Sequence, residues 1–160
     1  MQTTKSNIDI NYAIDKYSNM VYRLAVSRVG KKDIAEDVYQ EVFIRLNRNI
    51  NKIESESHLK NWLIKVTINC SKTELMSKWN NIEELPEDIK FETEEHHEIF
   101  EEVQKLDEKY RTVIHLFYYE DMKISEIAEM LDTNESTIKT WLSRARDILR
   151  KALGGDENEW

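Results

Sequence analysis

The sequence of 160 residues is poor in residues that interrupt helices, with three glycines and one proline. A sheet with several tight turns would need more of both, so such a sheet is disfavoured. Residues that tolerate helices well, such as glutamate, lysine, leucine and isoleucine, are abundant instead. The composition therefore predicts an all-α protein.

The sequence also lacks a pair of cysteines and any long apolar segment. Cys70 is the single cysteine and cannot form an internal disulfide, which fits a reducing cytosol. No apolar run approaches the ~18 residues that span a bilayer, and the first residues do not resemble a signal peptide. We therefore expect a soluble, cytoplasmic protein with no direct membrane insertion.

Signatures of catalysis are absent as well. The sequence has no glycine-rich phosphate loop, no Ser-His-Asp signature and no pattern of paired catalytic carboxylates. His96 and His97 lie among glutamates, but adjacent histidines on a regular helix cannot both face one metal ion. We expect neither enzymatic activity nor a metal or other cofactor. A metalloenzyme is one alternative to this expectation.

Charge is distributed unevenly along the chain. The formal net charge is −8, yet residues 83–108 contain 12 acidic and 2 basic residues, whereas residues 139–151 contain five basic residues and one acidic residue. The net charge thus conceals a basic C-terminal segment behind an acidic middle. This pattern permits nucleic-acid binding by one part of an acidic protein.

Two amphipathic helices are predicted near the N-terminus. The first covers about residues 10–29, with Gly30 as its C-cap. The second begins at Asp33, which we predict as the N-cap with Glu36 three residues later. Every third or fourth residue forms the expected buried stripe, which is Ile10, Ile14, Tyr17, Val21, Leu24 and Arg28 in the first helix and Ala35, Val38, Val42 and Leu46 in the second.

The next segment, residues 58–79, carries two competing patterns. Alternate apolar residues indicate a strand, whereas Leu59, Trp62, Leu63, Val66 and Cys70 repeat as in a helix. The length of the segment favours a helix. Its polar face would then contain Asn61, Lys65, Asn69 and Lys72.

An acidic, proline-containing stretch follows and separates two predicted domains. Residues 80–97 have few apolar side chains to bury, so we predict a flexible linker. Helical periodicity resumes afterwards at Ile99, Val103 and Leu106, with a cap at Asp107. The predicted organisation is therefore two small helical domains, residues 8–79 and 98–155, joined by an acidic linker, residues 80–97.

Residues 123–153 have the pattern of a helix-turn-helix. Asp132, Thr133 and Asn134 would form the turn, with either Thr133 or Asn134 as N-cap. Buried positions would be Ile124, Ile127, Ala128 and Leu131 in one helix and Ile138, Trp141 or Leu142, Ala145 and Leu149 in the other. The exposed positions of the second helix, Glu135, Ser136, Lys139, Thr140, Ser143, Arg144 and Arg146, offer hydrogen bonds to bases and cations to phosphates. A helical hairpin with a solvated basic face is the alternative.

Longer motifs resemble a known family. The segment DIAEDVYQEVFIRL, residues 33–46, resembles the most characteristic segment of the bacterial RNA polymerase sigma factors of the extracytoplasmic-function (ECF) group. The segment LKNWLIKVTINCSKTEL resembles the adjoining helix of the same domain, and LDEKYRTVIHLFYYEDMKISEIAEML with STIKTWLSRARDILRKAL resembles the second domain. The resemblance covers about residues 10–79 and 98–153.

The resemblance implies a function without chemistry of its own. Such factors bind core RNA polymerase, direct it to −10 and −35 promoter elements and help to open the duplex. They are commonly held inactive by an anti-sigma factor, and their linker threads through positively charged channels of the polymerase. The twelve carboxylates of residues 83–108 would suit that path, and they could also repel DNA from the isolated factor. An inert solubilising linker is an equal alternative.

Individual residues receive roles from the same resemblance. Three acceptors of the second helix would contact the clamp helices of the largest polymerase subunit: Asp37, Gln40 and Glu41. Asn61, Lys65, Asn69 and Lys72 would contact the −10 element, with Asn69 near a base turned out of the stack. Lys139, Thr140, Ser143 and Arg144 would read the −35 element, and Arg146 would contact a phosphate.

The chain also departs from the family pattern. Relatives usually carry arginines after the −10 helix where this chain has LMSKWNN, and Asp121 and Lys123 stand where glycine and a capping Ser or Thr are common. A free-standing helix-turn-helix regulator is the main rival function. That reading explains residues 123–153 but leaves the motif at residues 33–46 and the acidic linker unexplained.

Overall fold

The computed structural model describes residues 8–77 and 101–154, with side chains described up to residue 72 in the first part. The chain divides into two compact units, Met1–Pro86 and Glu87–Trp160, and each is considered separately. Every regular element in the described residues is a helix, which confirms the predicted all-α class. The predicted linker, residues 80–97, lies outside the described residues.

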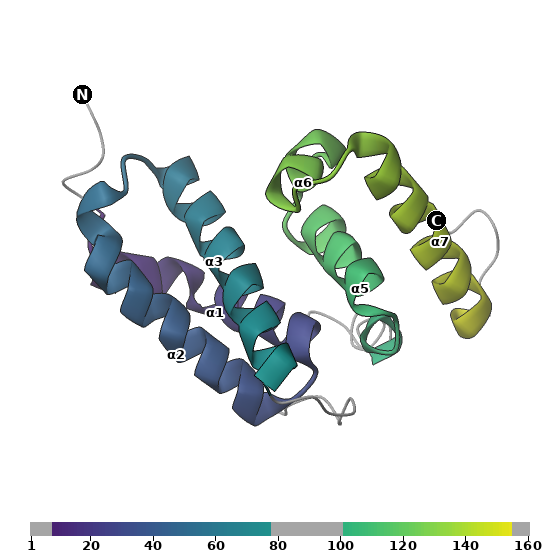
Figure 1. Cartoon of the computed structure of the whole chain (residues 1–160), viewed down its shortest axis with the longest axis horizontal. Helices are drawn as coiled ribbons and strands as arrows, with labels where there is room; N and C mark the ends of the chain where they lie inside the picture. The colour runs from purple at the N-terminus through teal and green to yellow at the C-terminus, as the bar shows by residue number, and fades with distance from the viewer. Residues whose placement is uncertain (1–7, 78–100, 155–160) are drawn as a thin grey trace. The chain divides into compact units, whose positions relative to one another are not determined.

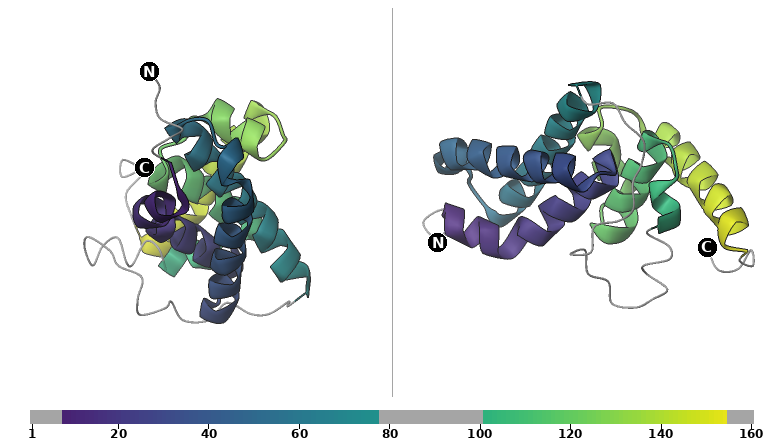
Figure 2. Two further views of the ribbon diagram at one scale, coloured as in Figure 1. Left: turned by 90° about the vertical axis from the view of Figure 1, so that its left-hand side faces the viewer. Right: turned by 90° about the horizontal axis from the view of Figure 1, so that it is seen from below.

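The first unit contains three long helices and one short turn. They are α1 (Ile10–Val29), α2 (Lys32–Asn49), the 3₁₀ turn η2 (Ile50–Lys52) and α3 (Glu56–Ser77). Each of α1, α2 and α3 packs against the other two, as Figures 1 and 2 show. The helical reading of residues 58–79 is thereby confirmed over the described range.

The ends of α1 follow local chemistry. Asp9 is the N-cap, and its side chain accepts a hydrogen bond from the Tyr12 N–H at 2.8 Å. At the other end Gly30 adopts the left-handed conformation with φ 76°, and its N–H donates to the Val26 carbonyl at 2.8 Å. Glycine reaches this conformation without a steric penalty, so the predicted C-cap is confirmed.

The start of α2 differs from the prediction. The helix begins at Lys32 with Lys31 as N-cap, and no side chain caps it. The first helical bond runs from the Ala35 N–H to the Lys31 carbonyl at 2.9 Å, so Asp33 lies inside the first turn. Its carboxylate still complements the positive end of the helix dipole, although it is not the N-cap.

The core of the first unit is apolar and closely packed. Ala35, Val38, Val42 and Leu46 of α2 are all 0% exposed, as predicted. In α1, Ile10 and Ile14 are only half-buried, while Ala13 and Met20 are buried. In α3, Leu59, Leu63 and Cys70 are buried as predicted, but Trp62 and Val66 are only half-buried. The stripe is rotated, and the core also receives Ile64, Thr67, Ile68 and Ser71.

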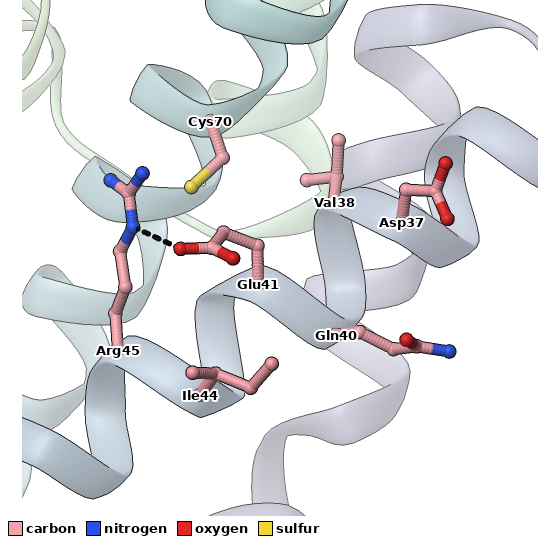
Figure 3. A pocket seen from close by; sticks show the side chains of 7 residues that line it. All are labelled: Asp37, Val38, Gln40, Glu41, Ile44, Arg45 and Cys70. Carbon is pink, nitrogen blue, oxygen red and sulfur yellow. Dashed lines mark hydrogen bonds and ion pairs between the residues drawn. The ribbon is translucent and has the colours of Figure 1, made fainter.

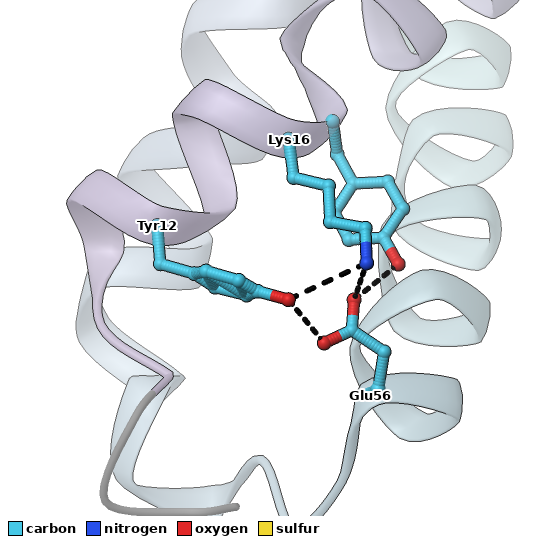
Figure 4. A network of polar contacts seen from close by, with 4 residues as sticks. Tyr12, Lys16 and Glu56 are labelled. Carbon is cyan, nitrogen blue, oxygen red and sulfur yellow. Dashed lines mark hydrogen bonds and ion pairs between the residues drawn. The ribbon is translucent and has the colours of Figure 1, made fainter.

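A polar cluster ties the beginning of α1 to the beginning of α3 (Figure 4). The Glu56 carboxylate accepts hydrogen bonds from the hydroxyls of Tyr12 and Tyr17, and it lies 3.0 Å from the Lys16 ammonium. Burial works to raise the pKa of Glu56, but the hydrogen bonds from Tyr12, Tyr17 and Lys16 together hold it below its usual value. Burial and the neighbouring Glu56 raise the pKa of Tyr17.

The second unit begins with helical residues 101–104 in the described part of the chain. It continues with α5 (Glu108–Ile114), the π-helix η3 (His115–Tyr119), α6 (Ile124–Met130) and α7 (Glu135–Leu153). Val103 and Leu106 are buried as predicted, and Asp107 is the N-cap of α5 but makes no side-chain capping bond. Ile99 lies outside the described residues, and the π-helix has no counterpart in the sequence prediction.

The pair α6 and α7 forms the predicted helix-turn-helix. Ile127 and Ala128 are buried, whereas Ile124 and Leu131 are half-buried. Asp121 before α6 and Asp132 after it have positive φ values of 55° and 56°. The left-handed backbone at Asp121 explains why glycine would suit that position.

Candidate functional site

The outer face of α2 carries the three residues assigned to polymerase binding. Asp37 and Gln40 are exposed, and Glu41 is half-buried. They line a pocket of about 410 Å³ with Val38, Ile44, Arg45 and, from α3, Cys70 (Figure 3). The structure therefore brings the three predicted residues together on one surface, with an apolar side chain beside them.

Glu41 on this face is engaged by its own helix. The Arg45 Nε lies 2.7 Å from Glu41 Oε2, and this hydrogen bond raises the pKa of Arg45. Both side chains are more than 40% exposed, so the pair contributes little to stability. A cationic partner that approached Glu41 would therefore exchange one ion pair for another at small cost.

A second pocket of about 390 Å³ adjoins the first between α1 and α2. Gln40 lines both pockets, so the two form neighbouring parts of one surface. Tyr22 of α1 and Tyr39 of α2 line the second pocket and meet edge to face, with ring centroids 6.3 Å apart. Aromatic side chains with polar neighbours are common at protein interfaces.

One face of α3 carries the residues assigned to the −10 element. Asn61, Lys65, Asn69 and Lys72 are all exposed, at spacings of three or four residues. The opposite face is anchored in the core, where the hydroxyls of Thr67 and Ser71 donate to the carbonyls of Leu63 and Thr67 at 2.6 and 2.7 Å. Trp62 is half-buried between the two faces, so its ring is only partly committed to the core.

The final helix α7 separates its faces in the same way. Ile138, Leu142, Ala145 and Leu149 are at most 1% exposed, so Leu142 rather than Trp141 completes the buried stripe. The four residues assigned to base reading are all exposed on the other side: Lys139, Thr140, Ser143 and Arg144. The backbone of α7 is thus fixed by packing while these side chains meet solvent.

Asn134 begins α7 and settles the choice between two possible caps. Its Oδ1 accepts from the Thr137 N–H, the Thr137 hydroxyl and the Ser136 hydroxyl, each at 2.8 Å. These bonds satisfy one of the free backbone donors at the start of the helix. They also fix the point at which the exposed face of α7 begins.

Arg146 departs from its predicted exposed position. It is half-buried, and its Nε donates to the Tyr118 hydroxyl at 2.7 Å. Its guanidinium also lies over the rings of Phe117 and Tyr118, at 5.6 and 5.7 Å from the ring centroids. The physical reason is that the aromatic residues of η3 attract the cation and partly cover it.

Comparisons with known proteins agree with this division of the chain. The family model described as Sigma-70 region 2 matches residues 13–81, and that described as Sigma-70, region 4 matches residues 96–149. The chain is 31% identical over 161 residues to the ECF RNA polymerase sigma factor SigW of Bacillus subtilis, with 88% of this chain and 86% of the relative covered. The chain belongs to the ECF sigma factors.

A second relative and a solved structure agree with this membership. RNA polymerase sigma factor SigV of Bacillus subtilis is 30% identical, with 95% of this chain and 94% of the relative covered. The fold is similar to that of the sigma factor RpoE from Bartonella quintana, with a TM-score of 0.79, 19% identity and coverage of 92% of this chain and 98% of the other. As a sigma factor, the protein binds core RNA polymerase and directs it to the −10 and −35 elements of promoters.

Sigma factors are initiation factors without enzymatic activity of their own. Within residues 8–77 and 101–154 of this sigma factor, no cluster of three or more His, Cys, Asp or Glu residues could hold a metal ion. In the same part of the chain, no helix combines the length and apolarity of a membrane span.

Two residues of these surfaces were not foreseen from the sequence. Ile44 is 47% exposed on the α2 face, although an apolar residue in an amphipathic helix is ordinarily assigned to the core. Its spacing of four from Gln40 and seven from Asp37 is the signal that could have placed it there. Tyr118 contacts Arg146 across 28 residues of sequence, and no local pattern indicates that contact.

Proposed function

We propose that the α2 face of this sigma factor docks on the clamp helices of the largest polymerase subunit. Asp37, Gln40 and Glu41 supply acceptors for basic side chains of the polymerase, and the exposed Ile44 beside them supplies apolar contact. The observation that carries this proposal is their position around one pocket of α2. A polar rim around an apolar side chain is the usual anatomy of a protein interface.

The exposed faces of α3 and α7 contact the promoter in this proposal. Asn61, Lys65, Asn69 and Lys72 bind the −10 element, where amides read exposed bases and lysines contact phosphates. Lys139, Thr140, Ser143 and Arg144 read the −35 element from the major groove. In both helices the reading side chains stand opposite the buried stripe, so DNA can approach without disturbing the core.

Regulation and location are inferred by analogy with the family. The RpoE structure from Bartonella quintana is a complex with the anti-sigma factor NepR. We infer that an anti-sigma factor also holds this chain inactive, and that the chain acts in the cytoplasm, without catalysis or a cofactor. The boundaries that we propose for the working parts are residues 8–79 for polymerase and −10 binding, 80–97 for the linker, and 98–155 for −35 binding.

Polymerase binding is tested by size exclusion of the purified chain mixed with bacterial core RNA polymerase. We expect stoichiometric co-elution of the wild type and its loss in Asp37→Lys, because the new cation repels the basic clamp surface. The matched control is Asp15→Lys, which makes the same charge change at an exposed position of α1. If the folded wild type does not co-elute, a free-standing helix-turn-helix regulator becomes the better description.

Promoter reading is tested by measuring binding of the reconstituted holoenzyme to DNA with native or scrambled −35 sequences. We expect Arg144→Ala to reduce discrimination between the two by about 1–3 kcal/mol, because a base contact is lost. Lys151→Ala removes the same charge from an exposed position in the last turn of the same helix and should leave discrimination unchanged. If Arg144→Ala instead weakens native and scrambled DNA equally, as Lys151→Ala should, α7 acts by charge attraction alone.

A further inference from the structure

Arg146 of α7 is held by residues of a different helix. Its Nε donates to the Tyr118 hydroxyl at 2.7 Å, and its guanidinium lies over both the Phe117 and Tyr118 rings. The two rings meet edge to face with centroids 4.9 Å apart. One cation is therefore fixed by a hydrogen bond and two aromatic surfaces at once.

The π-helix η3 fixes the position of these rings. Its wide turn is closed by the hydrogen bond from the Glu120 N–H to the His115 carbonyl at 3.2 Å. The side chains of the same two residues form a pair at 3.0 Å that is 1% and 8% exposed. Because this pair is buried, the end of η3 is anchored in the core while Tyr118 remains 44% exposed.

The geometry leaves the outer edge of the guanidinium available. Within the described part of the chain, Nε is the one nitrogen of Arg146 that donates a hydrogen bond. Among the same described residues, the two terminal nitrogens of Arg146 have no acceptor, and this edge of the guanidinium matches the oxygens of a phosphate. Arg146 also follows Ser143 by three residues, next to the face that the proposed function assigns to DNA.

We propose that Tyr118 is a positioning residue for DNA binding, which presents the Arg146 guanidinium to a backbone phosphate beside the −35 element. This inference rests on the proposed function of α7. An unrestrained arginine side chain samples many rotamers and loses conformational entropy when it binds. Because Tyr118 already holds Arg146 in the free protein, less entropy is lost on binding DNA. Tyr118 itself makes no base contact in this arrangement.

A double-mutant cycle on the reconstituted holoenzyme tests whether Tyr118 acts on DNA binding through Arg146. Promoter affinity is measured at several salt concentrations for the wild type, Arg146→Gln, Tyr118→Phe and the double variant. We expect Arg146→Gln to weaken native and scrambled −35 DNA equally and to lower the salt slope by about 1, because one phosphate contact is lost. Tyr118→Phe should weaken affinity about three- to tenfold and have no further effect when Arg146 is already Gln.

The matched control is Tyr110→Phe, which removes a hydroxyl from a half-buried tyrosine of α5 that contacts Lys109 instead. We expect it to leave affinity and salt slope unchanged. The Arg146 Nε–H signal in NMR spectra of the free chain gives a second readout, since its exchange with water should accelerate in Tyr118→Phe. If Tyr118→Phe lowers affinity equally in both backgrounds, or has no effect, the positioning role is refuted.

The same measurements separate this inference from the proposed function. If the wild-type holoenzyme does not distinguish native from scrambled −35 DNA, then α7 does not read that element and both proposals fail. If discrimination is present and depends on Arg144, while Tyr118 and Arg146 act independently, only the positioning role fails.

Discussion

The Glu56 carboxylate accepts a hydrogen bond from the Tyr17 hydroxyl at 2.6 Å and thereby joins the first turn of α3 to the middle of α1. The exposed face of α3 is the one proposed to bind the −10 element, and α1 forms one side of the second pocket. The bond therefore links the two helices that carry these surfaces. It also makes their stability depend on the charge of one carboxylate.

The first prediction concerns pH. Because the pKa of Glu56 is lowered in the folded state, its contribution is present above its unfolded pKa of about 4.3 and is lost as pH falls through the lower folded value. We expect Glu56→Gln to destabilise the first unit by about 1 kcal/mol or less at pH 7, since the side chain is 44% exposed. The difference from wild type should shrink by pH 3. Urea unfolding followed by NMR signals of the first unit measures it, and a difference that stays constant with pH would contradict the role of the carboxylate.

The second prediction separates the core of α2 from its outer face. Leu46 is 0% exposed, so Leu46→Ala should lower the free energy of unfolding of the first unit by about 2–5 kcal/mol through the cavity it leaves. Ile44, two residues earlier, is 47% exposed, and Ile44→Ala should change stability by no more than about 0.5 kcal/mol. Urea denaturation of both variants provides the measurement. A large loss for Ile44→Ala would place that side chain in the core and remove it from the docking surface.

The third prediction concerns the start of α7. Asn134→Ala removes the acceptor of three hydrogen bonds and should destabilise the second unit by about 1 kcal/mol. Hydrogen exchange of the first-turn amides should accelerate most. Asn134→Asp keeps the acceptor and adds a charge that suits the helix dipole, so it should be as stable as the wild type. Equal destabilisation by both substitutions would show that the amide nitrogen, rather than the oxygen, matters at this position.

Local chemistry was readable from the sequence wherever one or two neighbouring residues decide the outcome. Gly30 ends α1 because only a residue tolerant of positive φ fits there, and the exposed faces of α3 and α7 follow from helical periodicity alone. Asn134 was one of two possible caps, and only the backbone geometry of the turn distinguishes it from Thr133.

Features that depend on distant contacts were missed or misplaced. His115 begins the π-helix η3 and Glu120 caps it, and the two form a buried pair that no helical pattern indicates. The partial burial of Arg146 depends on Tyr118, 28 residues away. At Asp33 the capping pattern was present, but the N-cap is Lys31, two residues earlier, and the Ala35 N–H donates the first helical hydrogen bond to its carbonyl.

The division of α7 into a buried and an exposed face bears on how such a protein can change over evolutionary time. Ile138, Leu142, Ala145 and Leu149 hold the helix in place, and none of them is among the residues proposed to read DNA. Substitutions at the reading positions therefore leave the fold intact, since exposed positions contribute little to stability. A duplicated copy of this chain could acquire a new set of target genes through a few surface changes, while its attachment to the transcription machinery stayed as it was.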